Sequence, residues 1–219
     1  MLAFLAALAI IERDWPLVLM WLLAALAVDG VDGSLARWAK VKERAPRIDG
    51  ATLDLIIDYL NYVFIPALLI VRAELVPSSL APALAAAILV SSLYNFTRTD
   101  LKTADNYFRG FPALWNVVAF YLFAAGVSPE AAAIAVVLLA ALTFAPVHFV
   151  HPFRVRDYGR WLPLLACAWA AATVALLWKG WTGDARTALL AFSLAAGAAL
   201  IGLGLLRTLR GPQATAQSR

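Results

Sequence analysis

The chain has 219 residues, of which 63% are hydrophobic and only 15% are charged. A soluble domain is closer to about 45–50% apolar with about a quarter charged residues, so this composition excludes an ordinary water-soluble fold. The formal net charge is +4, but the basic residues are spread over short loops and indicate membrane topology rather than a nucleic-acid partner. A single cysteine excludes a disulfide framework within the chain. We therefore expect an all-α, polytopic helical membrane protein.

Apolar runs along the chain predict about eight transmembrane helices. A span needs about 20 residues, and somewhat shorter runs cross where their flanks extend or the bilayer thins. The first run is too short to cross, so we expect a truncated first helix. We therefore expect a single transmembrane domain over 1–208, followed by a disordered tail over 209–219. The predicted helical runs are 1–11, 15–38, 51–71, 77–97, 111–126, 129–150, 161–178 and 187–206.

The Lys and Arg residues alternate between basic loops and loops with few basic residues. Placing the 37–47 loop in the cytoplasm puts 14 of the 18 basic residues on that side, as the positive-inside rule requires. Both termini are then cytoplasmic as well. We expect a multi-pass membrane protein whose chemistry occurs at the cytoplasmic face.

Four aspartates lie at the margins of two apolar runs. Asp29 and Asp32 are three residues apart, and Asp54 and Asp58 are four apart, so each pair shares a helix face. The loop between the runs is cytoplasmic, so the pairs meet at similar depth on adjacent antiparallel helices. An ionised Asp at membrane depth costs about 2.5–3.5 kcal/mol without a compensating partner. Because no His or Cys is near, Mg²⁺ or Mn²⁺ is favoured over Zn²⁺, and two ions about 3.5–4 Å apart suit four carboxylates and phosphoryl-type displacement.

Small residues and an arginine accompany the aspartates. Gly33, Ala36 and Gly50 remove side-chain bulk beside the carboxylates, which lets a ligand approach the backbone. Arg37 stands about one turn past Asp32 and can pair with phosphate oxygens. Small residues are also common where membrane helices pack, and for Ala36 that alternative stays open.

The combined pattern is Asp29-x2-Asp32-Gly33-x2-Ala36-Arg37-x12-Gly50-x3-Asp54-x3-Asp58. It resembles the signature of the CDP-alcohol phosphatidyltransferase family. The twelve-residue spacer after Arg37 is longer than usual in that family and is similar to the spacer of its bacterial phosphatidylcholine synthase branch. The stretches 58–66, 111–121 and 151–155 also resemble that branch.

The resemblance implies transfer of a phosphatidyl group from CDP-diacylglycerol to choline, which yields phosphatidylcholine and CMP. By the same resemblance, Asp58 is the general base. Arg47, in the basic loop, is placed to steer the anionic head group of the donor. Whether the protein forms a homodimer is not decided by the sequence. The resemblance assigns metal binding to Asp29, Asp32, Asp54 and Asp58, and contacts with the CDP group to Asp29, Gly33, Ala36, Arg37 and Gly50.

The choline site is expected among polar and aromatic residues at the cytoplasmic ends of the third to fifth runs. A quaternary ammonium has no N–H to donate, so aromatic faces and nearby carboxylates hold it best. The alternative interpretation is an interfacial aromatic belt with a polar loop. The candidates are Tyr62, Tyr94, Asn95, Asp105, Trp115 and Asn116.

Two other functions remain in competition. The same family also uses serine, glycerol phosphate or inositol phosphate as acceptors, but a phosphorylated acceptor needs a cationic pocket, and the candidate residues are neutral, aromatic or acidic. A cation transporter would place its carboxylates near the midplane or along a path through the bilayer. Here all four aspartates lie at one side, next to a basic loop.

Overall fold

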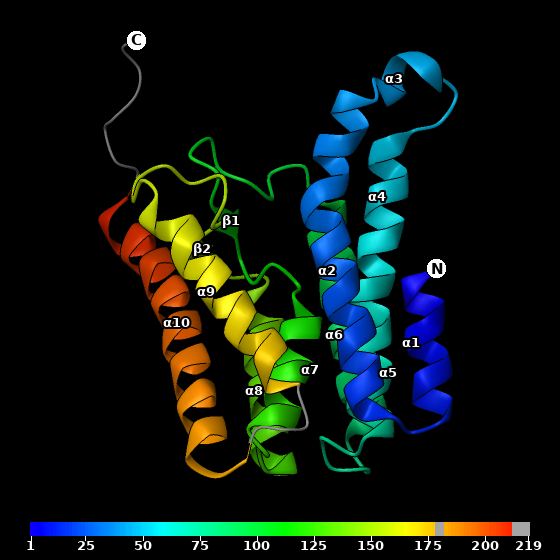
Figure 1. Cartoon of the computed structure of the whole chain (residues 1–219), viewed down its shortest axis with the longest axis vertical. Coiled ribbons are helices and arrows are strands. Elements are labelled where there is room, and N and C mark those ends of the chain that lie inside the picture. Colours follow the sequence, from blue (N-terminus) through cyan, green and yellow to red (C-terminus); the bar gives the residue numbers. More distant parts are fainter. Residues whose placement is uncertain (178–181, 212–219) are drawn as a thin grey trace. The chain divides into compact units, whose positions relative to one another are not determined.

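The computed structural model describes residues 1–177 and 182–211, and helices dominate it (Figure 1). The expected all-α class is confirmed. Within the described residues, three helical stretches are long and apolar enough to cross a membrane, 15–38, 50–72 and 183–210, while the total number of spans and the sidedness stay predictions. The elements are α1 (Leu2–Ile11), α2 (Trp15–Trp38), α3 (Val41–Arg44), α4 (Gly50–Tyr59), η1 (Leu60–Phe64), α5 (Ile65–Arg72), α6 (Ala81–Thr97), β1 (Phe108–Arg109), α7 (Trp115–Ala124), α8 (Pro129–Leu142), β2 (His148–Phe149), α9 (Trp161–Leu176) and α10 (Gly183–Arg210).

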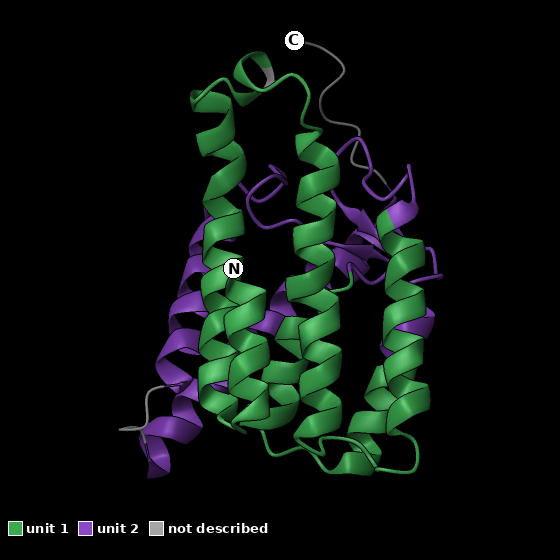
Figure 2. Ribbon diagram, turned by 90° about the vertical axis from the view of Figure 1, so that its right-hand side faces the viewer, with its two compact units in different colours: residues 1–96, 113–137 green, residues 97–112, 138–219 purple. Residues whose placement is uncertain are grey.

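The chain forms two compact units, which are coloured separately in Figure 2. Unit 1 contains Met1–Phe96 and Ala113–Val137, and unit 2 contains Thr97–Pro112 and Leu138–Arg219. All four aspartates of the sequence pattern belong to unit 1. Helix α10 continues to Arg210, so the first two residues of the predicted tail, 209–219, are helical. Residues 212–219 of that tail lie outside the described part of the chain.

In unit 1, α2 is packed along its first half and exposed along its second. Asp14 caps the helix by accepting a hydrogen bond from the backbone N–H of Leu17 at 3.2 Å, which satisfies one of the free amides of the first turn. Helix α1 packs against α2 and also contacts α5 (Figure 1). The buried residues of α2 all precede Leu26, and none of the residues 26–38, all of which are described, is buried. The half that carries Asp29 therefore presents its side chains outside the packed core of the unit.

The second long helix consists of α4, η1 and α5 without a break. Asp49 caps its start by accepting hydrogen bonds from the backbone N–H groups of Ala51 and Thr52 at 3.0 and 3.3 Å. None of the residues of α4, all of them described, is buried, whereas Tyr62 in η1 is buried. The helix widens into a single π-turn at η1, an irregularity that is frequent at functional sites. This turn begins two residues after Asp58, at the point where the helix enters the core of unit 1.

The predicted helical run 129–150 is wrong beyond Leu142, where α8 ends. Two backbone amides from the segment before α7 replace the helical hydrogen bonds there. Phe111 donates to the carbonyl oxygen of Leu142 at 3.1 Å, and Gly110 donates to that of Val147 at 2.7 Å. Pro146 has no N–H to donate and disfavours the helical conformation of the residue before it. Residues after Leu142 therefore form a loop and the short strand β2, although their composition is as apolar as that of the helix.

Unit 2 is built around the antiparallel pair of β1 and β2 and the helices α9 and α10. Phe108 pairs with Phe149, and Arg109 pairs with His148. Helix α10 packs against both α9 and β2. At the contact with β2 the helix carries Gly204, where a Cβ atom would overlap the carbonyl oxygen of His148. Only glycine lets the two backbones approach this closely.

An ion pair and a hydrogen-bonded tyrosine tie the connecting loops of unit 2 to α10. The buried Arg207 donates from Nε to Asp105 Oδ2 at 2.6 Å, and its guanidinium lies 5.6 Å from the ring centroid of Tyr107. Tyr107 in turn donates its hydroxyl to Asp157 Oδ2 at 2.9 Å. Burial raises the pKa of Tyr107, and the neighbouring carboxylate of Asp157 raises it further, so the phenol stays protonated and remains a donor.

Candidate functional site

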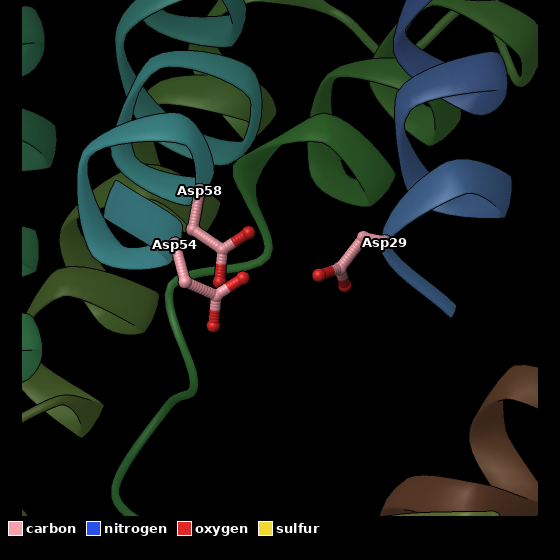
Figure 3. A group of neighbouring side chains, drawn as sticks. All are labelled: Asp29, Asp54 and Asp58. Atoms are coloured by element: carbon pink, nitrogen blue, oxygen red, sulfur yellow. The ribbon is translucent and has the colours of Figure 1, made fainter. Parts of the chain in front are cut away.

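Three of the four predicted metal ligands come together in unit 1. Asp29 extends from α2, and Asp54 and Asp58 extend from successive turns of α4 (Figure 3). One carboxylate oxygen from each lies within 4.8 Å of the other two, Asp54 is exposed, and the other two side chains are half-buried. Figure 3 shows the three carboxylates directed toward one another across a common space. Oxygen ligands alone, at this spacing, suit Mg²⁺ or Mn²⁺.

Asp32 lies outside this group of three. It follows Asp29 on α2 and is half-buried. Three residues advance an α-helix by about 300° rather than a full turn, so its side chain leaves α2 in a direction about 60° away from that of Asp29. The spacing of Asp54 and Asp58, at four residues, departs less from a full turn. A role for Asp32 in binding a second ion stays a prediction.

A buried tyrosine fixes the orientation of Asp29. The hydroxyl of Tyr62, in η1, donates a hydrogen bond to Asp29 Oδ2 at 2.7 Å. The bond links α2 to the π-turn and uses one lone pair of Oδ2, which leaves Oδ1 available for another partner. Such outer hydrogen bonds orient metal-ligating carboxylates and are important for affinity. Sequence reasoning assigned Tyr62 to choline; no sequence signal predicts its contact with Asp29.

The residues predicted to contact CDP line the exposed parts of α2 and α4. Gly33, Ala36 and Gly50 are exposed, as is Arg47 in the loop before α4. A Cβ atom at Gly50 would meet nothing within 4 Å. At Gly33 it would meet only Arg37 Nη1, at 3.5 Å. The glycines therefore do not serve close helix packing within unit 1, and the open space beside them is what an approaching nucleotide needs.

Arg37 is exposed on the same half of α2. It donates from Nη2 to the hydroxyl of Ser34 at 2.9 Å. This neutral partner orients the guanidinium without neutralising its charge. Arg37 therefore retains the charge that a pyrophosphate group requires.

The predicted choline residues other than Tyr62 divide into three groups. Asn95, Trp115 and Asn116 are buried in unit 1, and the indole N–H of Trp115 donates to Ser92 Oγ at 2.9 Å. Tyr94 is exposed on α6. Asp105 belongs to unit 2, where its carboxylate is paired with Arg207. Burial favours a raised pKa for Asp105, but hydrogen bonds from Arg207 and Thr103 outweigh it and lower the pKa. Its charge is thus already neutralised within its own unit.

Curated proteins with similar sequences share one name. The chain is 49% identical over 157 residues to the phosphatidylcholine synthase of Pseudomonas aeruginosa PAO1, which covers 72% of this chain and 66% of that protein. It is 42% identical over 174 residues to the phosphatidylcholine synthase of Bradyrhizobium diazoefficiens USDA 110, covering 79% and 65%. It is 39% identical over 170 residues to the phosphatidylcholine synthase of Agrobacterium fabrum C58, covering 78% and 70%.

The chain belongs to the phosphatidylcholine synthase family. The resemblance indicated by the aspartate pattern and its twelve-residue spacer is thereby confirmed. No family model matches the chain. The alignments span about two thirds of the length of the phosphatidylcholine synthases, 66% and 65% for the first two relatives.

Proposed function

We propose that the protein transfers the phosphatidyl group of CDP-diacylglycerol to choline and releases CMP. The observation that carries this proposal is the group of Asp29, Asp54 and Asp58 on two long apolar helices of a chain that belongs to the phosphatidylcholine synthase family. A lipid donor suits this position, because its acyl chains can remain in the bilayer while the nucleotide reaches the exposed halves of α2 and α4. We place the site at the cytoplasmic face on the basis of the basic loops, and in a bacterial inner membrane on the basis of the bacterial relatives.

Divalent cations fit the carboxylate group, since it offers only hard oxygen ligands. Asp29, Asp54 and Asp58 would hold one ion, and with Asp32 the set has enough carboxylates for two. When bound, such ions spread the negative charge that develops on the pyrophosphate. Tyr62 supports this role by fixing one oxygen of Asp29. The mutual repulsion of three carboxylates within 4.8 Å also favours a cation between them.

The chain's own residues supply positioning and proton transfer. Arg37, on α2, and Arg47, in the loop before α4, are exposed cations that bind the pyrophosphate oxygens. In the reaction, the choline oxygen forms a bond to the phosphatidyl phosphorus, and the bond from that phosphorus to the bridging oxygen breaks. The bridging oxygen leaves with CMP. Asp58 accepts the hydroxyl proton, a transfer that becomes favourable as the new bond forms.

The decisive experiment measures products from the purified protein. Incubation with CDP-diacylglycerol, labelled choline and Mn²⁺ should yield phosphatidylcholine and CMP in equal amounts, and chelation of the metal should stop both. Asp58→Asn should lower kcat by about 100-fold or more. Asp14→Asn is the matched control: this residue caps α2 through its side-chain oxygen, Asn caps equally well, and turnover should be unchanged.

Three outcomes would overturn the proposal. Full activity of Asp58→Asn would remove the proposed base. Turnover with serine, glycerol phosphate or inositol phosphate in place of choline would keep the chemistry but change the acceptor. Metal flux into liposomes without CMP release would instead favour a transporter.

A further inference from the structure

Three buried asparagines in unit 1 carry amide oxygens without a hydrogen-bond partner. Asn61, Asn95 and Asn116 are 6%, 1% and 4% exposed, and the Oδ1 atom of each lacks a partner among the described residues. Buried polar atoms in folded proteins are almost always hydrogen-bonded, because an unsatisfied acceptor destabilises the fold. Three such atoms in one compact unit indicate a place that a ligand completes.

Asn61 lies three residues after Asp58 and is held in a defined orientation. Its Nδ2 donates to the carbonyl oxygen of Ile57 at 2.9 Å. Because the amide nitrogen is directed to its own helix, the oxygen on the other side of the amide group is directed away from it. The π-turn buries this residue immediately after the exposed helix α4. The first unpartnered oxygen is therefore presented about one turn beyond the proposed base.

Contacts between helices bring Asn95 to the same level. Tyr59 donates its hydroxyl to the carbonyl oxygen of Leu89 at 3.1 Å, and its ring packs edge-on against Phe96 at 5.9 Å. The last turn of α4 thus lies against the stretch of α6 that carries Asn95. Asn61 is two residues beyond Tyr59 and Asn95 directly precedes Phe96, so the two amides lie at a similar level on neighbouring helices.

The first turn of α7 meets the same stretch of α6. Trp115 donates its indole N–H to Ser92 Oγ at 2.9 Å, and Asn116 is the next residue on α7. Helix α7 also contacts η1 and α2. The three unpartnered oxygens come from η1, α6 and α7. Helix α7 contacts η1 and is joined to α6 by the hydrogen bond from Trp115 to Ser92, and η1 is connected to the carboxylate group through Tyr62 and Asp29.

We infer that the amide oxygens of Asn61, Asn95 and Asn116 form the binding site for the cationic head of the acceptor alcohol, an inference that rests on the proposed function. Three desolvated carbonyl dipoles attract positive charge and repel a phosphate group, which has only acceptors to offer. The methyl groups of a quaternary ammonium carry part of its positive charge and make C–H···O contacts with such oxygens. The hydroxyl at the other end of choline is then directed toward Asp58. Trp115 contributes a buried apolar wall, and Tyr62 positions Asp29.

The test combines kinetics with binding in the full-length protein. Asn95→Leu and Asn116→Leu should each raise KM for choline by about tenfold or more, with KM for CDP-diacylglycerol unchanged. Without substrate, both variants should melt at or above the wild-type temperature, since each loses an unsatisfied buried acceptor. Choline should raise the melting temperature of the wild type but not of the variants. Ser91→Ala is the matched control on α6, because the buried Ser91 hydroxyl already donates to Ile88 at 3.3 Å.

A probe that requires no variant completes the design. Tetramethylammonium has the cationic head without the hydroxyl, so it should inhibit competitively against choline and raise the melting temperature, whereas glycerol phosphate should do neither. Wild-type KM for choline in both Leu variants, or lower melting temperatures with unchanged KM, would assign the amides to structure and overturn the inference. Failure of wild-type turnover would refute the proposed function separately, since the melting shifts with tetramethylammonium do not depend on turnover.

Discussion

Replacing Gly204 by alanine tests whether α10 and β2 are held at the distance the structure gives. A Cβ atom at this position would overlap the carbonyl oxygen of His148 and would lie 2.9 Å from Phe149 Cα. Both obstacles are backbone atoms, which cannot rotate away as the end of a flexible side chain can. The contact between α10 and β2 is further fixed by Thr208. Its hydroxyl donates to the carbonyl oxygen of Gly204 at 3.0 Å and accepts from the backbone N–H of His148 at 2.7 Å.

The magnitude follows from comparison with Gly202, two residues earlier on the same helix. A Cβ atom there would meet nothing within 4 Å. In a helix, alanine is more favourable than glycine by about 0.5–1 kcal/mol, so Gly202→Ala should stabilise the protein by about that amount. Gly204→Ala has the same gain but adds an overlap that costs about 1–3 kcal/mol. The two variants should therefore differ in unfolding free energy by about 1–3 kcal/mol.

The assay is thermal unfolding of both variants and the wild type in one detergent, followed by near-ultraviolet circular dichroism. The eight tryptophans of the chain report loss of tertiary packing. Gly204→Ala should melt below the wild type, and Gly202→Ala at or above it. If Gly204→Ala were as stable as Gly202→Ala, the close approach of α10 to β2 would be refuted.

Three further predictions concern charged and polar contacts. Arg207→Met removes the ion-pair partner of the partly buried Asp105 carboxylate and should destabilise the protein by about 3 kcal/mol. The double variant with Asp105→Asn should lose less stability than the sum of the two single variants. Additive losses in this double-mutant cycle would contradict the pairing. Burial, followed by the nearby charges of Arg154 and Lys102, lowers the pKa of His151 from 6.5 to about 4, so its contribution to stability is complete above about pH 6.5 and is lost as the pH falls toward 4. His151→Phe keeps the stacking on Phe108 at 5.5 Å and should flatten the dependence of melting temperature on pH in that window; an unchanged profile would exclude His151 as its source. Tyr62→Phe removes the hydrogen bond to Asp29 and should weaken Mn²⁺ binding about 10–100-fold in a titration followed by electron paramagnetic resonance, while equal affinity would show that the hydroxyl does not position the ligand.

Local features were predictable where a short pattern determines the structure. The four-residue spacing of Asp54 and Asp58 places both on one helix face, and the structure has them converge with Asp29. Long apolar runs predicted α2, the 50–72 helix and α10. In each case the information lies within a few turns of one helix, and the periodicity of side chains is enough to recover it.

Features that depend on contacts between distant segments were not predictable. Pro146 is a local signal against helix, but the position at which α8 ends also depends on backbone hydrogen bonds from Gly110 and Phe111, about 30 residues earlier in the chain. The pairing of Asp105 with Arg207 joins residues 102 positions apart. Asp105 was a candidate for choline because it offers a carboxylate near the cytoplasmic ends of the third to fifth runs, and nothing local to it in the sequence indicates Arg207 as its partner. The sequence pattern also treated Asp32 as equivalent to Asp29, because a shared helix face is a coarser criterion than the direction of a carboxylate.

The π-turn at η1 divides the 50–72 helix into two segments whose sequence periodicities are out of phase. A π-turn holds about one residue more than an α-turn, and in a regular α-helix one residue corresponds to about 100° of rotation. The π-turn takes up this extra residue without adding rotation, so the sequence periodicity after Phe64 is shifted by one position relative to Asp54 and Asp58. Deleting one residue between Leu60 and Phe64 would restore a regular helix while α5 kept facing the same side. Alignments with related chains that place a one-residue gap there would therefore still join equivalent helical faces.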